Sequence, residues 1–402
     1  MYATWWTLLD GEGEWMRVPA VIMRGGTSKG LFFHEKDLPE DPVVRDRFIL
    51  AAYGSPDPYG RQVDGLGGAT STTSKVAVIG DGAPHGVDVS YDFGQVAIGQ
   101  PLVDRRGNCG NISSAVGPFA VDEGLVEATD PVTPVRFLNV NTGKVIVAHV
   151  PTKNGRYDPV GDYEIPGVPG SGAQIRLDYV EPAGAVTGRL LPTGNVTDTL
   201  DVAGVGTVEV SLVDAANPLV FVRWTDLGLD GAEHPDEIDS DPALLARIEA
   251  VRAEASVLAG IAPTTDEATR DVPSVPKLAF VGPPRDYLTS DGEKVVATDT
   301  SLRAAMMSMG RVHRSYPLTG ALCTAVATAV EGTVANRVAP AEAGVTRIGH
   351  PAGVLAMEAH PRLTPEGWAV DAVSGHRTAR RLMEGWALVP DETLGGADTR
   401  PA

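Results

Sequence analysis

The chain has 402 residues and a formal net charge of −19, because 33 Lys and Arg stand against 52 Asp and Glu. This acidic balance argues against binding to nucleic acid or to an anionic membrane, since both need a basic surface. Two cysteines cannot build a disulfide scaffold and no apolar run is long enough to span a membrane, so we expect a cytoplasmic protein. The length predicts two or three domains.

Residues 1–15 lack the basic start and apolar core of a secretory signal, and we expect them to form an irregular extension. Beyond them, the first half alternates short β-branched runs with glycine-rich turns. The runs expected to be strands are 18–23, 76–79, 87–91 and 145–150. Many strands and few helical patterns indicate an α+β protein dominated by sheet.

Two glycine-containing turns lead into apolar helical patterns. In the first, over 107–124, apolar residues recur at spacings of four and three, which places them on one helix face. The second covers 319–330, where small apolar residues indicate a helix buried on most sides. Each pattern carries a cysteine near its start, and the two cysteines lie about half the chain apart. This repetition predicts two similar α+β halves that divide within 181–194.

A third helical pattern follows an acidic stretch. Residues 226–241 contain seven Asp and Glu, and we expect a solvated loop there. Asp241 and Pro242 then supply an N-cap and a first-turn proline. Apolar residues repeat at helical spacing up to Gly260, which predicts a structural surface helix.

One loop of the first half, at 24–30, combines glycines with hydroxyl and lysine side chains. Its glycines let backbone N–H groups approach an anion, and Thr27, Ser28 and Lys29 add further donors. The same pattern also fits a tight glycine turn without a ligand. From the residues alone, the two interpretations stand equal.

A second loop, at 64–75, places five consecutive hydroxyl residues directly before Lys75. Hydroxyls such as those of Ser71 and Thr72 can bind carboxylate oxygens, and a desolvated lysine can lose its proton near neutral pH. The alternative is a solvated loop that ends in an ordinary surface lysine. Pattern alone favours that alternative slightly.

Cys109 stands at the start of the first helical pattern, where the helix dipole stabilises a thiolate and makes the thiol a usable acid or base. Its neighbours Asn108, Gly110 and Asn111 supply further donors. An inert buried cysteine is the alternative, but the polar surroundings favour function. Cys323 lies deeper in its apolar helix, so core packing is favoured there.

The absence of several known motifs argues against metal, hydrolase and dinucleotide-binding sites. No His-Glu-x-x-His or paired Cys-x-x-Cys occurs, so we expect no zinc site. A nucleophile elbow and a dinucleotide-binding fingerprint are also missing from the sequence.

His313 and Arg314 lead directly into the second helix, which starts near Thr319 and Gly320. Arg314 either binds a carboxylate bidentately or forms a surface salt bridge.

Seven stretches together resemble the PrpF family of cofactor-independent isomerases. They run in order from about residue 16 to residue 385 and comprise residues 23–30, 64–75, 107–117, 276–279, 313–320, 348–351 and 377–383. The resemblance implies a diaminopimelate-epimerase-like α+β fold with two related domains. Each domain is expected to wrap a sheet around a central helix, with the active site between the domains.

The resemblance also implies boundaries and site residues. The two domains are expected at 16–187 and 188–385, with a tail at 386–402 that returns to the first domain. Lys75 and Cys109 match the family's catalytic lysine and cysteine, and no cofactor or metal is implied. Cys323 falls where related epimerases carry a second acid/base, so it is a further candidate for that role.

We therefore hypothesise a 1,3-proton shift that moves a C=C bond in an unsaturated di- or tricarboxylate such as methylaconitate or aconitate. The developing negative charge needs hydrogen-bond donors. The candidates for binding it are Thr27, Ser28, Lys29, Ser71, Thr72, Asn108, Gly110, Asn111, Arg314, Thr319 and Gly320.

Two alternatives are a 4-oxalomesaconate keto–enol tautomerase and a non-catalytic protein that binds an aconitase. The small carboxylate substrate is the expected binding partner. The sequence does not decide whether the protein forms a homo-oligomer. Because the substrate is anionic and the chain is acidic, the hypothesis predicts a positive pocket within a negative surface.

Overall fold

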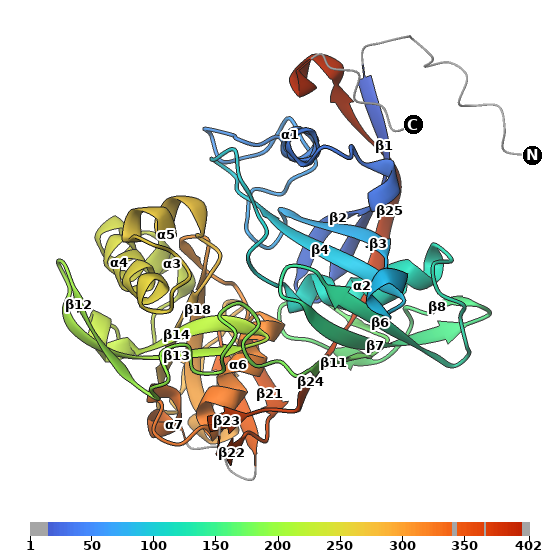
Figure 1. Ribbon diagram of the computed structural model, residues 1–402. Coiled ribbons are helices and arrows are strands. Elements are labelled where there is room, and N and C mark those ends of the chain that lie inside the picture. Colours follow the sequence, from blue (N-terminus) through green and yellow to red (C-terminus); the bar gives the residue numbers. More distant parts are fainter. Residues whose placement is uncertain (1–14, 340–343, 366, 396–402) are drawn as a thin grey trace, which may run out of the picture.

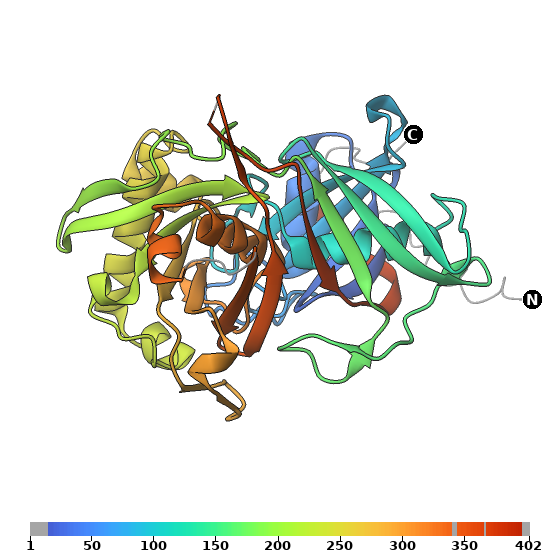
Figure 2. The same cartoon turned by 90° about the horizontal axis from the view of Figure 1, so that it is seen from below.

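The computed structural model describes residues 15–339, 344–365 and 367–395, so the expected extension at 1–14 and the end of the tail at 396–402 lie outside the described residues. Two lobes lie side by side (Figures 1 and 2). The first lobe contains β1 (Trp15–Gly25), β2 (Ser28–His34), α1 (Pro42–Tyr53), β3 (Lys75–Asp81), β4 (Val89–Val96), β5 (Val103–Asp104), α2 (Gly110–Asp122), β6 (Val132–Asn139), β7 (Lys144–Lys153), β8 (Arg156–Tyr157), β9 (Tyr163–Glu164), β10 (Ser171–Gly172) and β11 (Ile175–Val180).

The rest of the chain forms the second lobe and then returns to the first. Its elements are β12 (Asp198–Val202), β13 (Gly206–Ala215), β14 (Asn217–Arg223), α3 (Pro235–Asp239), α4 (Pro242–Leu258), α5 (Thr265–Asp271), β15 (Lys277–Gly282), β16 (Tyr287–Leu288), β17 (Lys294–Val295), β18 (Leu302–Ser308), β19 (Arg311–Val312), α6 (Leu318–Ala329), α7 (Val334–Val338), β20 (Val345–His350), β21 (Gly353–Glu358), β22 (Arg362–Thr364), β23 (Gly367–Ala369), β24 (Ala372–Arg377) and β25 (Ala379–Pro390).

The two lobes repeat one pairing scheme. In the first, the order β1-β2-β3-β4-β6-β7 alternates antiparallel and parallel pairs, beginning and ending with an antiparallel pair. In the second lobe, the strand order β13-β14-β15-β18-β20-β21 shows the same alternation of antiparallel and parallel pairs. Helix α2 lies between β4 and β6, and α6 lies between β18 and β20. The strand order therefore reveals the internal repeat that the two helical patterns predicted.

A central helix fills the core of each lobe. Every residue of α2 from Gly110 to Val121 is buried, as is every residue of α6 from Leu318 to Thr328. The sheets curl around these helices (Figure 2). The spacing predicted one buried face for α2, and this was too narrow, because a helix enclosed by sheet is buried on all sides. The prediction that the second helix is buried on most sides is confirmed.

The lobes join through strands that cross between them. β11 pairs with β7 on one side and with β24 on the other, and β24 also meets β21. The chain then runs as β25 antiparallel to β1, which Figure 1 shows as a long strand beside the N-terminal one. This return starts at Ala379, whereas the resemblance implies a second domain that extends to residue 385.

The acidic segment before α4 is more ordered than expected. Within 226–241, α3 forms a short helix capped by the His234 side chain, so the prediction of a plain solvated loop was wrong. The N-cap prediction holds, because the Asp241 side chain accepts from the backbone N–H groups of Ala243 and Leu244. Among the described residues, none of the helices has the length and apolar character needed to cross a bilayer.

Candidate active site

The two central helices differ from the rest at their N-termini. Cys109 is the N-cap of α2 and Pro317 is the N-cap of α6, and neither helix has a side-chain cap. In contrast, side chains cap the other α-helices of the described ranges; these caps are Asp41, His234, Asp241, Thr264 and Thr333. The first N–H groups of a helix have no partner within it, so α2 and α6 keep these donors for another acceptor.

Gly110 lets these two N-termini approach each other. A Cβ atom at this position would lie 2.7 Å from the Tyr179 hydroxyl oxygen and 3.0 Å from carbon atoms of Leu318 and Thr319. Any side chain here would push α2 away from α6. The absence of a Cβ therefore allows the two sets of helix donors to face one space between the lobes.

Lys75 is the first residue of β3, and its buried ammonium points toward the same space. Nζ donates to Gln95 Oε1 at 2.5 Å and lies 5.4 Å from the centre of the Phe93 ring. The Gln95 amide nitrogen in turn donates to the backbone oxygens of Ser71 and Ser74, which fixes its orientation. Burial lowers the pKa of Lys75, while the neighbouring Cys109 acts in the opposite direction.

A small pocket holds these groups together. Of the residues that the sequence singled out, Ser28, Lys75, Asn108, Cys109, Asn111 and Thr319 line it. Phe93, Gln95, Gly107, Ser274, Lys277, Ser308, His313 and Pro317 complete the lining. This lining contains two lysines and no carboxylate, in a chain of net charge −19, which agrees with the predicted positive pocket.

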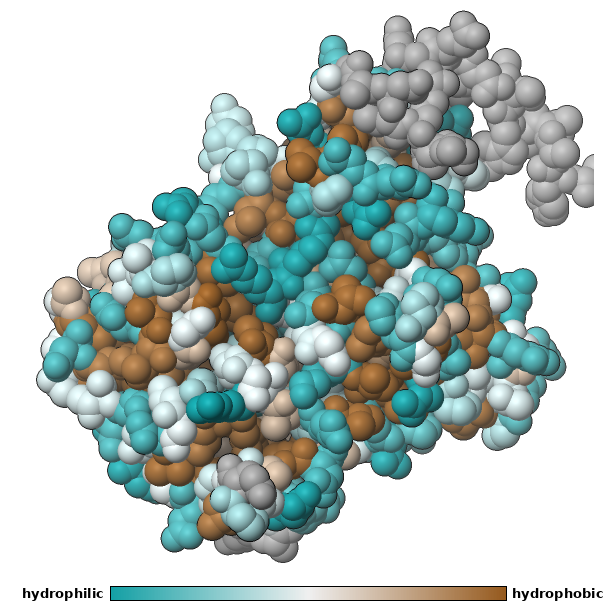
Figure 3. Space-filling model, viewed as in Figure 1, coloured by the Kyte–Doolittle hydropathy of each residue, from teal (hydrophilic) through white to brown (hydrophobic). Residues whose placement is uncertain are grey.

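The pocket continues into a wider cleft between the lobes. The inner space is about 20 Å³, and Ser308 and His313 line both it and an outer cleft of about 680 Å³. On the face seen in Figure 3, mainly hydrophilic side chains lie along the boundary between the lobes. The outer cleft therefore adjoins, at Ser308 and His313, the pocket that holds Lys75 and Cys109.

Three buried hydroxyls of the pocket lining lack a protein partner. The side-chain oxygens of Ser28, Ser274 and Thr319 have no hydrogen-bond partner within the part of the chain that the structure describes. Each of these residues is at most 3% exposed. Because buried polar groups are nearly always paired, three such hydroxyls around one pocket indicate a polar ligand.

Asn111 connects the start of α2 to the second lobe. Its Nδ2 donates to Thr27 Oγ1 at 2.9 Å, and Arg377 Nε donates to its Oδ1 at 3.0 Å. Ser315 Oγ then donates to Thr27 Oγ1 at 3.1 Å. Thr27 is therefore a link between the lobes beside the pocket, and it does not line the pocket itself.

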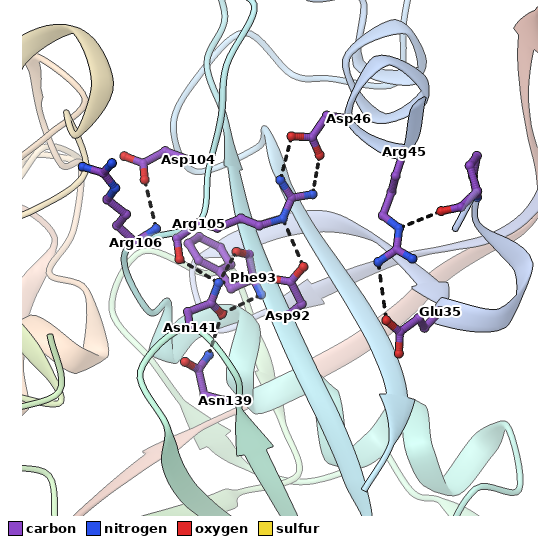
Figure 4. Close-up of polar contacts among 11 residues, drawn as sticks. Glu35, Arg45, Asp46, Asp92, Phe93, Asp104, Arg105, Arg106, Asn139 and Asn141 are labelled. Carbon is purple, nitrogen blue, oxygen red and sulfur yellow. Dashed lines mark hydrogen bonds and ion pairs between the residues drawn. The ribbon is translucent and has the colours of Figure 1, made fainter. Parts of the chain in front are cut away.

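A polar network fixes the segment that leads into Cys109 (Figure 4). Arg105 forms ion pairs with Asp46 of α1 and Asp92 of β4, and Asn141 Nδ2 donates to the backbone oxygen of Arg105 at 2.7 Å. The Asp104 carboxylate accepts from the backbone N–H of Arg106 at 3.0 Å. These contacts hold the approach to α2 in one conformation, which in turn positions the thiol.

His313 also lines the pocket, although the sequence only marked it as the residue that leads toward the second helix. It is 5% exposed, and burial together with the Lys75 charge lowers its pKa to about 3. The imidazole is therefore neutral near pH 7. Its Nδ1 accepts from the Ser315 backbone N–H at 3.1 Å, which leaves the proton on Nε2 as a donor.

Several predicted binding residues lie outside the pocket. Ser71 and Thr72 line the outer cleft instead. Lys29 follows Ser28 on β2, and because successive side chains of a strand alternate, it lies on the opposite face. Gly320 packs against Met306 and allows α6 to lie close to β18.

Arg314 pairs with two carboxylates of its own chain. Its guanidinium forms ion pairs with Asp236 at 2.7 Å and Asp239 at 2.9 Å, and its side chain is half exposed. These two carboxylates belong to α3, the helix that replaced the expected loop. Arg314 therefore makes the surface salt bridge that was its alternative, but it also lines the outer cleft beside His313, so carboxylate binding by Arg314 stays a prediction.

Cys323 lies in the apolar core and does not line the pocket. It is fully buried, its thiol donates to the Val213 backbone oxygen at 3.3 Å, and burial raises its pKa well above the usual range. The position in α6 that corresponds to Cys109 is the N-cap, Pro317, so Cys323 does not occupy the position equivalent to Cys109. We therefore do not retain it as a second acid/base.

Sequence reasoning missed Lys277, Ser274, Gln95 and Ser308. A signal existed for Lys277, since it heads an apolar strand as Lys75 does and lies in one of the stretches that carry the family resemblance. The other three are single polar residues without a motif. Only the pairing of distant strands brings them to the pocket.

Comparison with known proteins places this geometry in a family. The family model described as "PrpF protein" matches residues 15–390. The chain is 44% identical to 3-methylitaconate isomerase of Eubacterium barkeri, covering 94% of this chain and 99% of that protein. It is 41% identical to 2-methyl-aconitate isomerase of Cupriavidus necator, with 94% and 98% covered. A 4-oxalomesaconate tautomerase of Pseudomonas putida is 37% identical, with 95% and 99% covered.

Solved structures agree with the sequence relatives. The crystal structure of a methylitaconate-delta-isomerase is 43% identical and superimposes with a TM-score of 0.74, covering 96% of this chain and all of that one. A hydroxyproline epimerase from Agrobacterium vitis, at 14% identity, shares the fold with a TM-score of 0.54 over 96% and 97% of the two chains. The expected epimerase-like fold is confirmed, and the chain belongs to the PrpF protein family.

Proposed function

We propose that this isomerase moves a C=C bond of an unsaturated di- or tricarboxylate, of the methylaconitate or methylitaconate type, by a 1,3-proton shift. The observation that carries the proposal is the meeting of the Lys75 ammonium and the Cys109 thiol in one pocket, between two helix N-termini without side-chain caps. The names of the relatives at 44% and 41% identity support this substrate class.

The pocket has donors for the negative charge that such a reaction develops. Loss of an allylic proton beside a conjugated carboxylate spreads charge onto the carboxylate oxygens. The free N–H groups of α2 and α6 and the unpartnered hydroxyls of Ser28 and Thr319 suit those oxygens. Because these groups are held by the fold, they need little reorganisation when the charge appears.

Lys75 and Cys109 supply the proton transfers. One group removes the allylic proton, and the other delivers a proton to the carbon two bonds away, so the proton count of substrate and product is equal. Burial lowers the pKa of Lys75, which raises the fraction of neutral amine that can accept a proton. The proposed step moves no electrons to an external acceptor and therefore calls for no cofactor.

Substrate entry requires the lobes to separate. The inner pocket, at about 20 Å³, has room for about one water molecule, which is far less than a tricarboxylate needs. The substrate must therefore enter from the outer cleft past Ser308 and His313 while the N-termini of α2 and α6 move apart. Closing again would exclude water from the reacting groups.

The test is direct turnover by the purified protein without added metal or cofactor. We expect ultraviolet absorbance changes with trans-aconitate or 2-methylaconitate, and proton NMR in D₂O to locate the shifted hydrogen. Turnover of 4-oxalomesaconate alone would assign the tautomerase activity instead. No turnover of any of these acids, together with stable binding to an aconitase, would assign the accessory role.

A further inference from the structure

Lys277 is the counterpart of Lys75 in the internal repeat. Lys75 is the first residue of β3, which runs parallel to β2, and Lys277 is the first residue of β15, which runs parallel to β14. Lys75 lies opposite Gln95 on the next strand. The register of β15 and β18, continued by two residues, places Ser308 opposite Lys277. Both lysines line the same pocket, one from each lobe.

The Lys277 ammonium keeps donors for a ligand. Nζ donates to the Ser274 backbone oxygen at 3.0 Å, and an ammonium has two more N–H donors. The nearby Asp104 carboxylate already accepts from the backbone N–H groups of Ser274 and Arg106. The pocket lining itself contains no acidic residue, so Asp104, which lies outside the lining, is the carboxylate that acts on the Lys277 ammonium.

Ser274 lies beside this ammonium and adds a neutral donor. It is 3% exposed, and its hydroxyl has no hydrogen-bond partner among the described residues. The loop that carries it is held from both sides. Asp104 of the first lobe accepts from the Ser274 N–H, and the Arg252 guanidinium of α4 donates to the Val275 oxygen at 3.2 Å.

From this arrangement we infer that Lys277 and the Ser274 hydroxyl form a second carboxylate subsite, on the wall of the pocket that the second lobe contributes. The inference rests on the proposed function, because it names the part of the pocket that holds a carboxylate remote from the migrating proton. Burial and the nearby Lys75 lower the pKa of Lys277 to about 8, so in most molecules the Lys277 side chain is protonated at pH 7. A bound carboxylate supplies a counter-ion within the pocket itself.

The experiment measures equilibrium binding of tricarballylate, a saturated tricarboxylate that has no allylic proton to lose, by calorimetry. In K277M we expect the Kd to rise at least tenfold, because a charge-assisted hydrogen bond is lost. K277R should recover most of that affinity. The Kd of K277M should also depend less steeply on salt concentration, since one cation has been removed. Lys294→Met, which removes a half-exposed lysine paired with Asp286, is the matched control.

S274A separates binding from folding. Its hydroxyl has no partner in the described structure, so the variant should be as stable as the parent protein and yet bind tricarballylate at least threefold more weakly. Parental affinity in S274A, or in a K277M protein with parental Tm, would overturn the subsite. Weak binding by both variants alongside a parent that isomerises no acid would keep the subsite and reject the proposed reaction. If the parent protein isomerises one of the acids and both variants bind tricarballylate as the parent does, the proposed reaction is kept and the subsite is rejected.

Discussion

The N-termini of α2 and α6 are the same structural feature built twice, with different chemistry. Each lobe has a lysine as the first residue of a strand, Lys75 of β3 in the first lobe and Lys277 of β15 in the second. Neither helix has a side-chain cap. At the N-cap, however, α2 has Cys109 and α6 has Pro317. The repeat therefore supplies two cations and two sets of helix donors, but only one ionisable group at a helix start.

This difference implies a division of labour. The first lobe carries the proposed acid/base pair, Lys75 and Cys109, while the second lobe contributes Lys277, neutral His313 and Pro317 to the pocket. A symmetric pair of acid/base thiols is excluded, because Cys323 lies in the core away from the pocket. We propose that the first lobe performs the proton transfers, and that the second lobe adds a carboxylate subsite to the donors of the two helix N-termini.

The largest predicted effect comes from the first lobe. K75A and C109A should each lower kcat on the true substrate by about 10²- to 10⁴-fold, since each removes a positioned acid or base. K277M should act mainly on KM. Steady-state kinetics of the three purified variants, with circular dichroism to verify folding, test this division. Near-parental kcat in both first-lobe variants would reject the acid/base pair.

G110A tests the close approach of the two helices. The added Cβ would meet Tyr179, Leu318 and Thr319 at 2.7 to 3.0 Å, and such overpacking costs about 1–3 kcal/mol of unfolding free energy. Activity should fall as well, because the facing donors are pushed apart. Urea denaturation measures the stability change. Gly385→Ala is the control, since its nearest contact, Met383 Sδ at 3.4 Å, is an ordinary van der Waals distance.

The pH dependence of binding tests the second lobe's cation. Because the pKa of Lys277 is lowered to about 8, its charge is present below that pH and is lost above it, so tricarballylate affinity should fall as pH rises through about 8. The groups that act on it are Lys75, Cys109, Asp104 and Arg252. K277R, which keeps its charge, should show a flatter alkaline limb. Identical pH profiles of K277R and the parent would contradict the assignment.

C323A should have the smallest effect. Removing this buried thiol leaves a small cavity and takes away one weak hydrogen bond to Val213, so we expect a loss of about 1 kcal/mol in unfolding free energy. The kcat should stay at the parental value. C109A measured in parallel gives the contrast between the two cysteines, and a large fall of kcat in a folded C323A protein would restore Cys323 as a participant.

Local sequence signals located most of the first lobe's site. The glycine turn before α2 and the apolar spacing within it predicted both the helix and the position of Cys109 at its start. Lys75 stood out because five hydroxyl residues precede it. Arg314 was ambiguous for a physical reason, since a guanidinium fits a substrate carboxylate and an aspartate equally well, and the partners lie 75 and 78 residues away.

By itself, the sequence determined several strands, the two central helices and the family, because periodicity, glycine placement and ordered motifs are local properties. Only the tertiary structure decided which side chains share the pocket. Strand pairing within each lobe places Lys75 and Lys277 at the starts of equivalent strands, and both lysines line the one pocket. The missing Cβ of Gly110 lets the two helix starts meet. Residues about 200 positions apart become neighbours through sheet register and close packing, and neither is encoded in any single stretch of the chain.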